Sequence, residues 1–215
     1  MNFDAVVFDM DGLLLDTERI AQATFIESCQ DLAAPFSMEV YLRIIGGNAA
    51  HTREVFFAEY GAAFPYDQVR ARWLEKYAAK ALHQQVPLKE GAPELIAMLH
   101  RSGIPIAVAT STAYEHAVTK LRNAGLHHYF QFVVAGDQVT YSKPHPEIYT
   151  KAVTRLALDP ARCLALEDSE NGVRAAHAAG MFVIQVPDLV PPSEGLKALG
   201  HTIVDNLHLV HAYFI

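Results

Sequence analysis

Two aspartates at the end of one apolar segment are the residues of this chain best suited to chemistry. Asp9 and Asp11 follow the run 5–8, whose apolar residues predict a short buried strand. Side chains two positions apart on a strand share one face, so both carboxylates can point at one site. One could then act as a nucleophile and the other as a general acid and base, with a metal ion between them. The alternative is an acidic turn that closes the strand at Gly12.

Three later segments place further reactive side chains directly after apolar runs. Thr110 and Ser111 offer hydroxyls where a strand leads into a helix, which suits a phosphate, although ordinary helix capping would place them there too. Lys143 stands between a turn and a helix opened by proline, where a fixed ammonium can neutralise a carboxylate and a phosphoryl group. Glu167 and Asp168 carry the oxygen ligands that Mg²⁺ prefers, and the alternative is two acids that favour a helix N-terminus.

Alternating strand and helix patterns must position these side chains. After the run 5–8, strands are expected at 106–109, 132–135, 163–166 and 182–186, and helices at 93–102, 114–124, 146–156 and 171–179. This alternation predicts a doubly wound parallel sheet, a Rossmann-like α/β core formed by residues 1–16 plus 86–215. Four helical stretches at 17–32, 37–45, 49–60 and 67–84 predict an α-helical cap domain, residues 17–85, inserted after the first strand. Ligands bind beyond the carboxyl ends of such strands, where all four reactive segments are expected.

Composition excludes several classes of protein. The 215 residues are 51% hydrophobic, which is typical of a folded protein rather than a disordered one. The net charge of -7, without a basic stripe, argues against a nucleic-acid partner. Cys29 and Cys163 lie far apart, as expected for reduced thiols in a cytoplasmic protein. Asp4, Asp9 and Asp11 interrupt any signal peptide, and no apolar run could span a bilayer, so we expect no membrane partner. A monomer is expected.

The four reactive segments together resemble a known set of motifs. Their order along the chain is Asp9-Met10-Asp11-Gly12, Thr110, Lys143-Pro144 and Glu167-Asp168. On these motifs the chain is identified as a member of the haloacid dehalogenase (HAD) superfamily, in the β-phosphoglucomutase-like phosphatase group. The resemblance covers essentially the whole chain, including the helical cap, and implies a phosphoric monoester hydrolase. Dehalogenase members lack the second acid and need no Mg²⁺, so phosphoryl transfer is favoured over carbon–halogen cleavage.

The resemblance also implies a role for each motif residue. Asp9 would attack phosphorus and form an aspartyl-phosphate, and Asp11 would protonate the leaving group and then deprotonate water. Lys143 would offset negative charge, and Thr110, with Ser111 beside it, would bind the phosphoryl oxygens.

The implied cofactor is Mg²⁺. It would be held by Asp9, the backbone carbonyl of Asp11 and Asp168, and Glu167 would assist through water or hydrogen bonds.

The cap is expected to select the substrate, a small phosphorylated metabolite such as a sugar phosphate or a nucleoside monophosphate. The candidate contacts are Glu18, Gly47, Asn48, His51 and Arg72. Mutases of the group carry a histidine and an arginine where an ungapped alignment places Ala21 and Ala50, which favours a phosphatase. A phosphomutase of the β-phosphoglucomutase type is the alternative, and a catalytically idle protein that binds a phosphorylated ligand is a third hypothesis.

Overall fold

Two compact units make up the chain. The computed structural model describes residues 3–45 and 49–214. Met1–Asp16 and Val86–Ile215 form one unit, and Thr17–Gln85 forms the other. We refer to them as the α/β unit and the helical unit.

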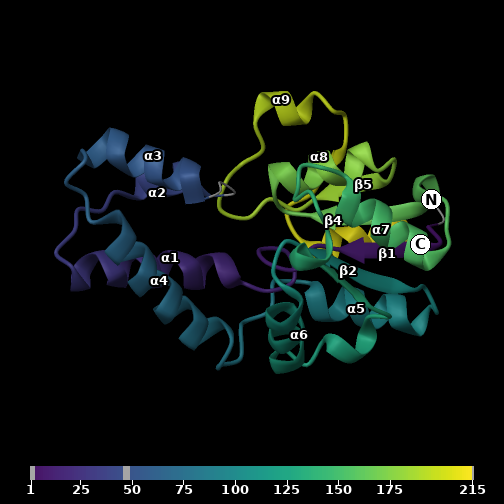
Figure 1. Ribbon diagram of the computed structural model, residues 1–215. Helices are drawn as coiled ribbons and strands as arrows, with labels where there is room; N and C mark the ends of the chain where they lie inside the picture. Colours follow the sequence, from purple (N-terminus) through teal and green to yellow (C-terminus); the bar gives the residue numbers. More distant parts are fainter. Residues whose placement is uncertain (1–2, 46–48, 215) are drawn as a thin grey trace. The chain divides into compact units, whose positions relative to one another are not determined.

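A parallel sheet is the centre of the α/β unit, as predicted (Figure 1). Its order is β3-β2-β1-β4-β5-β6, and every neighbouring pair is parallel. The strands are β1 (Ala5–Phe8), β2 (Ile106–Thr110), β3 (Val133–Ala135), β4 (Cys163–Glu167), β5 (Phe182–Gln185) and β6 (Thr202–Ile203). Strand order reverses between β1 and β4, and ligands of such folds bind at that switch point. Asp9 and Glu167 lie at these two strand ends.

Helices cover both faces of this sheet, and all residues of β1, β2 and β4 are buried. In Figure 1, α5 and α6 lie on one side of the sheet and α7 and α8 on the other. The helices are α5 (Ala92–Arg101), α6 (Tyr114–Asn123), α7 (Glu147–Leu156), α8 (Glu170–Ala178) and α9 (Glu194–Lys197), with 3₁₀ turns at His127–Tyr129, Gly136–Gln138, Pro160–Arg162 and Leu207–Phe214. The single turn α9 is not among the predicted elements, and Ser193 caps it by accepting the Leu196 N–H.

In the part of the helical unit that the structure describes, four helices surround an aromatic core. They are α1 (Thr17–Asp31), α2 (Met38–Ile44), α3 (Ala49–Tyr60) and α4 (Tyr66–Ala81). Phe25 of α1 lies at the centre, 5.3 Å from Phe56 and 5.2 Å from Trp73 between ring centroids. The Trp73 indole N–H also donates to the Ala21 carbonyl at 2.8 Å, which ties α4 to α1.

The structure also describes the two cysteines and the length and hydropathy of the helices. Cys29 and Cys163 are both buried free thiols. Among the described residues, the structure contains no helix with the length and apolar character needed to cross a membrane.

Candidate active site

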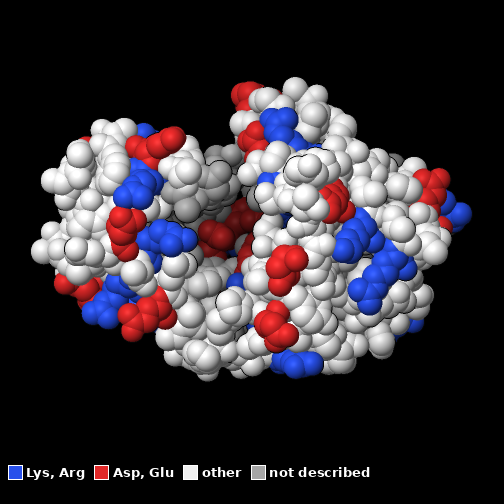
Figure 2. Space-filling view, viewed as in Figure 1, with Lys and Arg blue, Asp and Glu red and all other residues white. Residues whose placement is uncertain are grey.

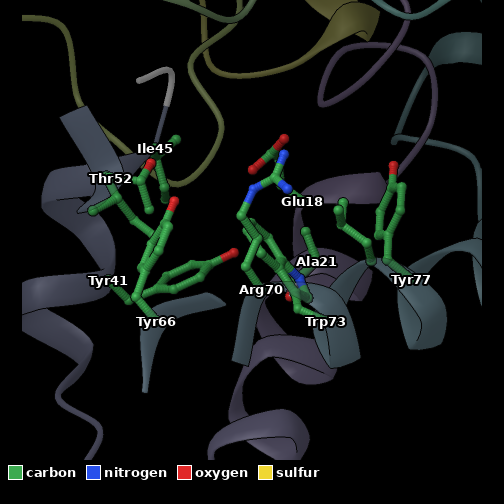
Figure 3. Close-up of a pocket in the computed structure, with 11 residues that line it drawn as sticks. Glu18, Ala21, Tyr41, Ile45, Thr52, Tyr66, Arg70, Trp73 and Tyr77 are labelled. Atoms are coloured by element: carbon green, nitrogen blue, oxygen red, sulfur yellow. The ribbon is translucent and has the colours of Figure 1, made fainter. Parts of the chain in front are cut away.

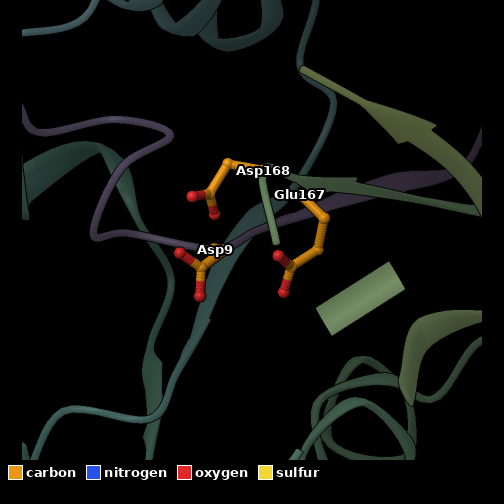
Figure 4. Close-up of side chains that lie close together, drawn as sticks. All are labelled: Asp9, Glu167 and Asp168. Atoms are coloured by element: carbon orange, nitrogen blue, oxygen red, sulfur yellow. The ribbon is translucent and has the colours of Figure 1, made fainter. Parts of the chain in front are cut away.

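Three carboxylates meet at the carboxyl ends of β1 and β4 (Figure 4). Each of Asp9, Glu167 and Asp168 places one oxygen within 4.8 Å of the others. The pairing of Phe8 with Leu166 brings the strand ends together, and the Asp9 N–H donates to the Leu166 carbonyl at 2.9 Å. The group is compact enough to hold a divalent cation, and its oxygen donors are of the kind that Mg²⁺ prefers.

Lys143 supplies the buried positive charge of this site. Its ammonium donates to Asp9 Oδ1 and Glu167 Oε1, both at 2.6 Å, and to the Ala109 carbonyl at 3.0 Å. Its side chain is 5% exposed. Burial by itself lowers the pKa of Lys143, but the Asp9 and Glu167 carboxylates outweigh it and raise the pKa above its ordinary 10.5. The lysine therefore stays charged and holds one oxygen of each acid.

The Asp9 carboxyl is a weaker acid than usual because it is buried. Burial raises its pKa from 3.8 to about 7, opposed by the Lys143 ammonium and assisted by the nearby Glu167 and Asp11 carboxylates. A divalent cation bound among these oxygens would favour the ionised form, which is the form that a nucleophile needs.

Glu167 is fixed from several sides. Its side chain is fully buried and accepts the Tyr149 O–H at Oε1, 2.6 Å away, and the Ser169 O–H at Oε2, 3.1 Å away. Gly172 in the first turn of α8 makes room for it, because a Cβ there would lie 1.8 Å from Oε1. From the resemblance, Glu167 is predicted to act through water or hydrogen bonds; in the structure its carboxylate lies in the three-acid group with Asp9 and Asp168.

Asp11 is held by different partners. β1 ends at Phe8, so the strand rule does not govern its orientation. Its Oδ1 accepts from the Lys120 ammonium at 2.7 Å, and its Oδ2 accepts from the Thr112 hydroxyl at 2.6 Å. Among the described residues, the three-acid group does not include the Asp11 carboxylate. From the sequence alone, Thr112 belongs to the hydroxyl-rich segment after a predicted strand but has no role of its own, and Lys120 is not predicted, although a lysine on the apolar face of the predicted helix 114–124 is a signal.

The loop after β2 presents hydroxyls and backbone N–H groups. The Thr110 side chain is buried, and its hydroxyl accepts the Thr112 N–H at 3.2 Å, whereas Ser111 is exposed. Gly136 packs against this loop so closely that a Cβ would lie 2.2 Å from the Ser111 carbonyl oxygen. β2 pairs with β1, so this loop and Asp9 leave neighbouring strands at the same edge of the sheet.

A separate cavity of about 320 Å³ lies within the helical unit (Figure 3). Its lining combines aromatic rings with two charged side chains: Glu18, Tyr41, Tyr66, Arg70, Trp73 and Tyr77. Figure 3 shows the Arg70 guanidinium pointing toward the Glu18 carboxylate. Four of these residues lie on one face of α4, because they are spaced three or four positions apart: Tyr66, Arg70, Trp73 and Tyr77. Tyr41 and Trp73 also pack in the aromatic core of the helical unit, so they serve both the core and the cavity wall.

The residues predicted to contact the substrate from the cap lie in different places in the helical unit. Glu18 lines the cavity. Arg72 pairs with Asp31 at 3.3 Å and with Glu75 at 3.2 Å on an exposed surface. His51 is exposed and lies 3.2 Å from the Arg43 carbonyl oxygen. Gly47 and Asn48 lie outside the described residues.

Charges of both signs are interspersed elsewhere on the surface. On the face shown in Figure 2, lysine and arginine side chains alternate with aspartate and glutamate side chains among uncharged residues.

Comparisons with known proteins identify the family of this chain. A family model described as haloacid dehalogenase-like hydrolase matches residues 3–180. Protein CbbY of Rhodobacter capsulatus is 34% identical, covering 95% of this chain and 94% of the relative. A phosphorylated carbohydrates phosphatase of Thermotoga maritima is 30% identical, covering 83% of this chain and 82% of the relative.

A solved structure extends the similarity to the fold. It belongs to a Thermotoga maritima protein whose assignment as a β-phosphoglucomutase is provisional, and it superposes with a TM-score of 0.79 at 27% identity, covering 97% and 98% of the two chains. The predicted phosphoric monoester hydrolase activity and the predicted family are thereby confirmed. The chain belongs to the haloacid dehalogenase-like hydrolase family.

Proposed function

We propose that this phosphatase hydrolyses a small phosphorylated metabolite, a sugar phosphate or a nucleoside monophosphate, through an aspartyl-phosphate and with Mg²⁺ as cofactor. The observation that carries the proposal is the placement of Asp9 between the Lys143 ammonium and two further carboxylates at the switch point of the sheet. The α/β unit would hold the catalytic machinery, and the helical unit would act as the cap.

In the first step, an Asp9 oxygen attacks phosphorus and the ester bond to the leaving oxygen breaks. The leaving oxygen takes a proton from Asp11. In the second step, Asp11 accepts a proton from water, whose oxygen attacks the aspartyl-phosphate and releases inorganic phosphate and Asp9. Nucleophilic catalysis by Asp9 splits one difficult displacement into two easier ones, and Asp11 assists each of them by proton transfer.

The phosphoryl group needs donors and positive charge. The buried Thr110 hydroxyl, Ser111 and the Lys143 ammonium are the proposed donors. Lys143 contacts Asp9 directly, so it can orient the nucleophile and offset the charge of the phosphoryl oxygens together.

The donor set fits a magnesium ion. Asp9, Asp168 and the Asp11 backbone carbonyl would hold it, with Glu167 in support. The bound ion would stabilise negative charge on the phosphoryl oxygens. The carboxylate oxygens of Asp9, Glu167 and Asp168, which lie within 4.8 Å of one another, support this assignment. The part given to the Asp11 carbonyl follows from the family resemblance.

Substrate selection is assigned to the helical unit. Glu18 and the aromatic rings of the cavity offer hydrogen-bond acceptors and flat apolar surfaces, which suit a sugar or a nucleoside. The named relative that acts on phosphorylated carbohydrates supports a sugar phosphate. Gly47, Asn48, His51 and Arg72 stay predictions, as do the monomeric state and the cytoplasmic location.

A phosphomutase is the second candidate. The provisional β-phosphoglucomutase favours it, and Arg70 places a cation in the cavity, where a second phosphate could bind. Ala21 also lines the cavity, at the position where the mutases of the group carry histidine, and this favours hydrolysis.

Phosphate release from a panel of phosphate monoesters tests the proposal. Each ester is assayed with Mg²⁺, with a chelator, and with an Asp9→Asn variant whose folding is checked by circular dichroism. We expect release that needs Mg²⁺ and is lost in the variant, together with a phosphorylated Asp9 peptide after an acid quench. Substantial activity in the variant would contradict the role of Asp9. Isomerisation of a sugar phosphate that requires a bisphosphate activator would favour the mutase, and absence of both reactions would favour the idle binder.

A further inference from the structure

Lys120 is a buried lysine outside the motifs of the site. It lies on α6, where Ala117, Val118 and Leu121 form the buried face, and only 3% of the residue is exposed. A buried ammonium is costly unless a carboxylate compensates for its lost hydration. Its partner is Asp11, 2.7 Å away and 109 residues distant in sequence. The helix thus directs a charge at the acid that the proposed reaction uses for proton transfer.

Thr112 holds the second oxygen of the Asp11 carboxylate. Its hydroxyl donates to Asp11 Oδ2 at 2.6 Å, while Lys120 donates to Oδ1. Thr112 is itself fixed, because its N–H donates to the Thr110 hydroxyl and its carbonyl accepts the Gly136 N–H at 3.0 Å. Two donors on two oxygens restrict both rotatable bonds of the aspartate.

We propose that Lys120 and Thr112 are positioning residues that hold the Asp11 carboxylate in place for proton transfer to the leaving oxygen. This inference rests on the proposed function. A buried ion pair is by itself weak evidence for stability, because desolvation offsets most of its attraction. The Asp11 side chain is 21% exposed, so without these donors its carboxylate could turn toward water. Proton transfer requires the acid to lie within hydrogen-bond reach of the leaving oxygen.

The dependence of the rate on the leaving group separates positioning from a purely structural role. An alkoxide leaving from a sugar phosphate must be protonated, whereas p-nitrophenolate is stable without a proton. Loss of acid positioning therefore slows the alkyl ester far more than p-nitrophenyl phosphate. A general loosening of the site slows both esters alike. The value of kcat/KM reports this first step, which includes departure of the leaving group.

The experiment compares both esters in the full-length chain with Mg²⁺, using the best alkyl ester from the panel. Lys120→Met removes the charge at similar length. Thr112→Val removes the hydroxyl at constant shape, and its matched control Thr112→Ser keeps a hydroxyl. Asp11→Asn shows the largest fall in kcat/KM that loss of the general acid can cause. The double variant with Lys120→Met tests whether Lys120 acts through Asp11.

We expect kcat/KM for the alkyl ester to fall about 10- to 100-fold in Lys120→Met, mainly through kcat, since displacement of a reacting group by 1 Å can cost about 100-fold. The loss for p-nitrophenyl phosphate should be several-fold smaller. Thr112→Val should show the same bias and Thr112→Ser should not. Adding Lys120→Met to Asp11→Asn should cause little further loss, because both act on one step.

Equal losses for the two esters, or no loss, would overturn the positioning role while leaving the proposed function intact. If Lys120→Met fails to fold, the Thr112 pair decides the question. No turnover of either ester by the unmodified chain would instead overturn the proposed function, and the inference with it.

Discussion

Replacement of Gly172 by alanine should disturb the site through one methyl group. A Cβ at this position would lie 1.8 Å from Glu167 Oε1 and 2.1 Å from Oε2. The carboxylate would have to move about 1.6 Å to reach an ordinary contact of 3.4 Å. It cannot move freely, because it is fully buried and accepts from Lys143 and Tyr149, each at 2.6 Å. The substitution therefore separates Glu167 from the lysine that also holds Asp9.

Three effects set the size of the change in stability. Overpacking costs about 1–3 kcal/mol. A weakened hydrogen bond to a charged group costs about 1.5–3 kcal/mol. Alanine favours the helix over glycine by about 1 kcal/mol, which partly offsets these two losses of stability. We expect Gly172→Ala to lower the free energy of unfolding by about 2–5 kcal/mol and kcat/KM by about 100-fold.

Urea unfolding and phosphatase assays measure the two effects. The matched control is Gly195→Ala in α9, where a Cβ would lie no closer than 3.9 Å to the Arg174 side chain, so a small effect is expected. Wild-type stability and turnover in Gly172→Ala would refute the argument that Glu167 is held rigidly.

Three further predictions concern other contacts. Lys143→Met leaves Asp9 and Glu167 as buried carboxylates without their shared cation, so we expect about 3–5 kcal/mol of destabilisation in urea, and unchanged stability would contradict this. The backbone N–H groups of Thr140 and Tyr141 donate to the Glu147 carboxylate and lower its pKa below 4.5. This contribution is present above pH 4.5 and is lost as the pH falls through the lowered pKa, so the difference in Tm between wild type and Glu147→Gln should shrink below pH 4.5; a constant difference would argue against it. Trp73→Phe removes the 2.8 Å bond to the Ala21 carbonyl and should lower the stability of the helical unit by about 1 kcal/mol in chemical unfolding, whereas no change would mean that this hydrogen bond contributes nothing measurable to the packing of α4 on α1.

Local patterns explain why much of the fold was predictable. The run 5–8 becomes β1 at Ala5–Phe8, and the predicted helix 49–60 becomes α3 with the same ends. Apolar runs and glycine or proline boundaries are local signals, so they survive in the fold. The turn α9 was missed because four residues carry too little periodicity to distinguish a helix from a loop.

Long-range contacts explain what was missed at the site. Arg70 and Arg72 stand two residues apart on α4, and only the packing of α4 against α1 decides that Arg70 lines the cavity while Arg72 pairs at the surface. A sequence identifies a helical face but does not name the neighbour that meets it.

The sequence by itself determined which reactive side chains follow strands, because parallel strands bring their carboxyl ends to one edge and the order of apolar runs predicts such a sheet. Only the tertiary structure decided how these side chains pair. Lys143 meets Asp9 across 134 residues, and Lys120 meets Asp11 across 109. Hydrophobic periodicity encodes which face of an element is buried, but the polar partners found there depend on the register and packing of elements far apart in the chain.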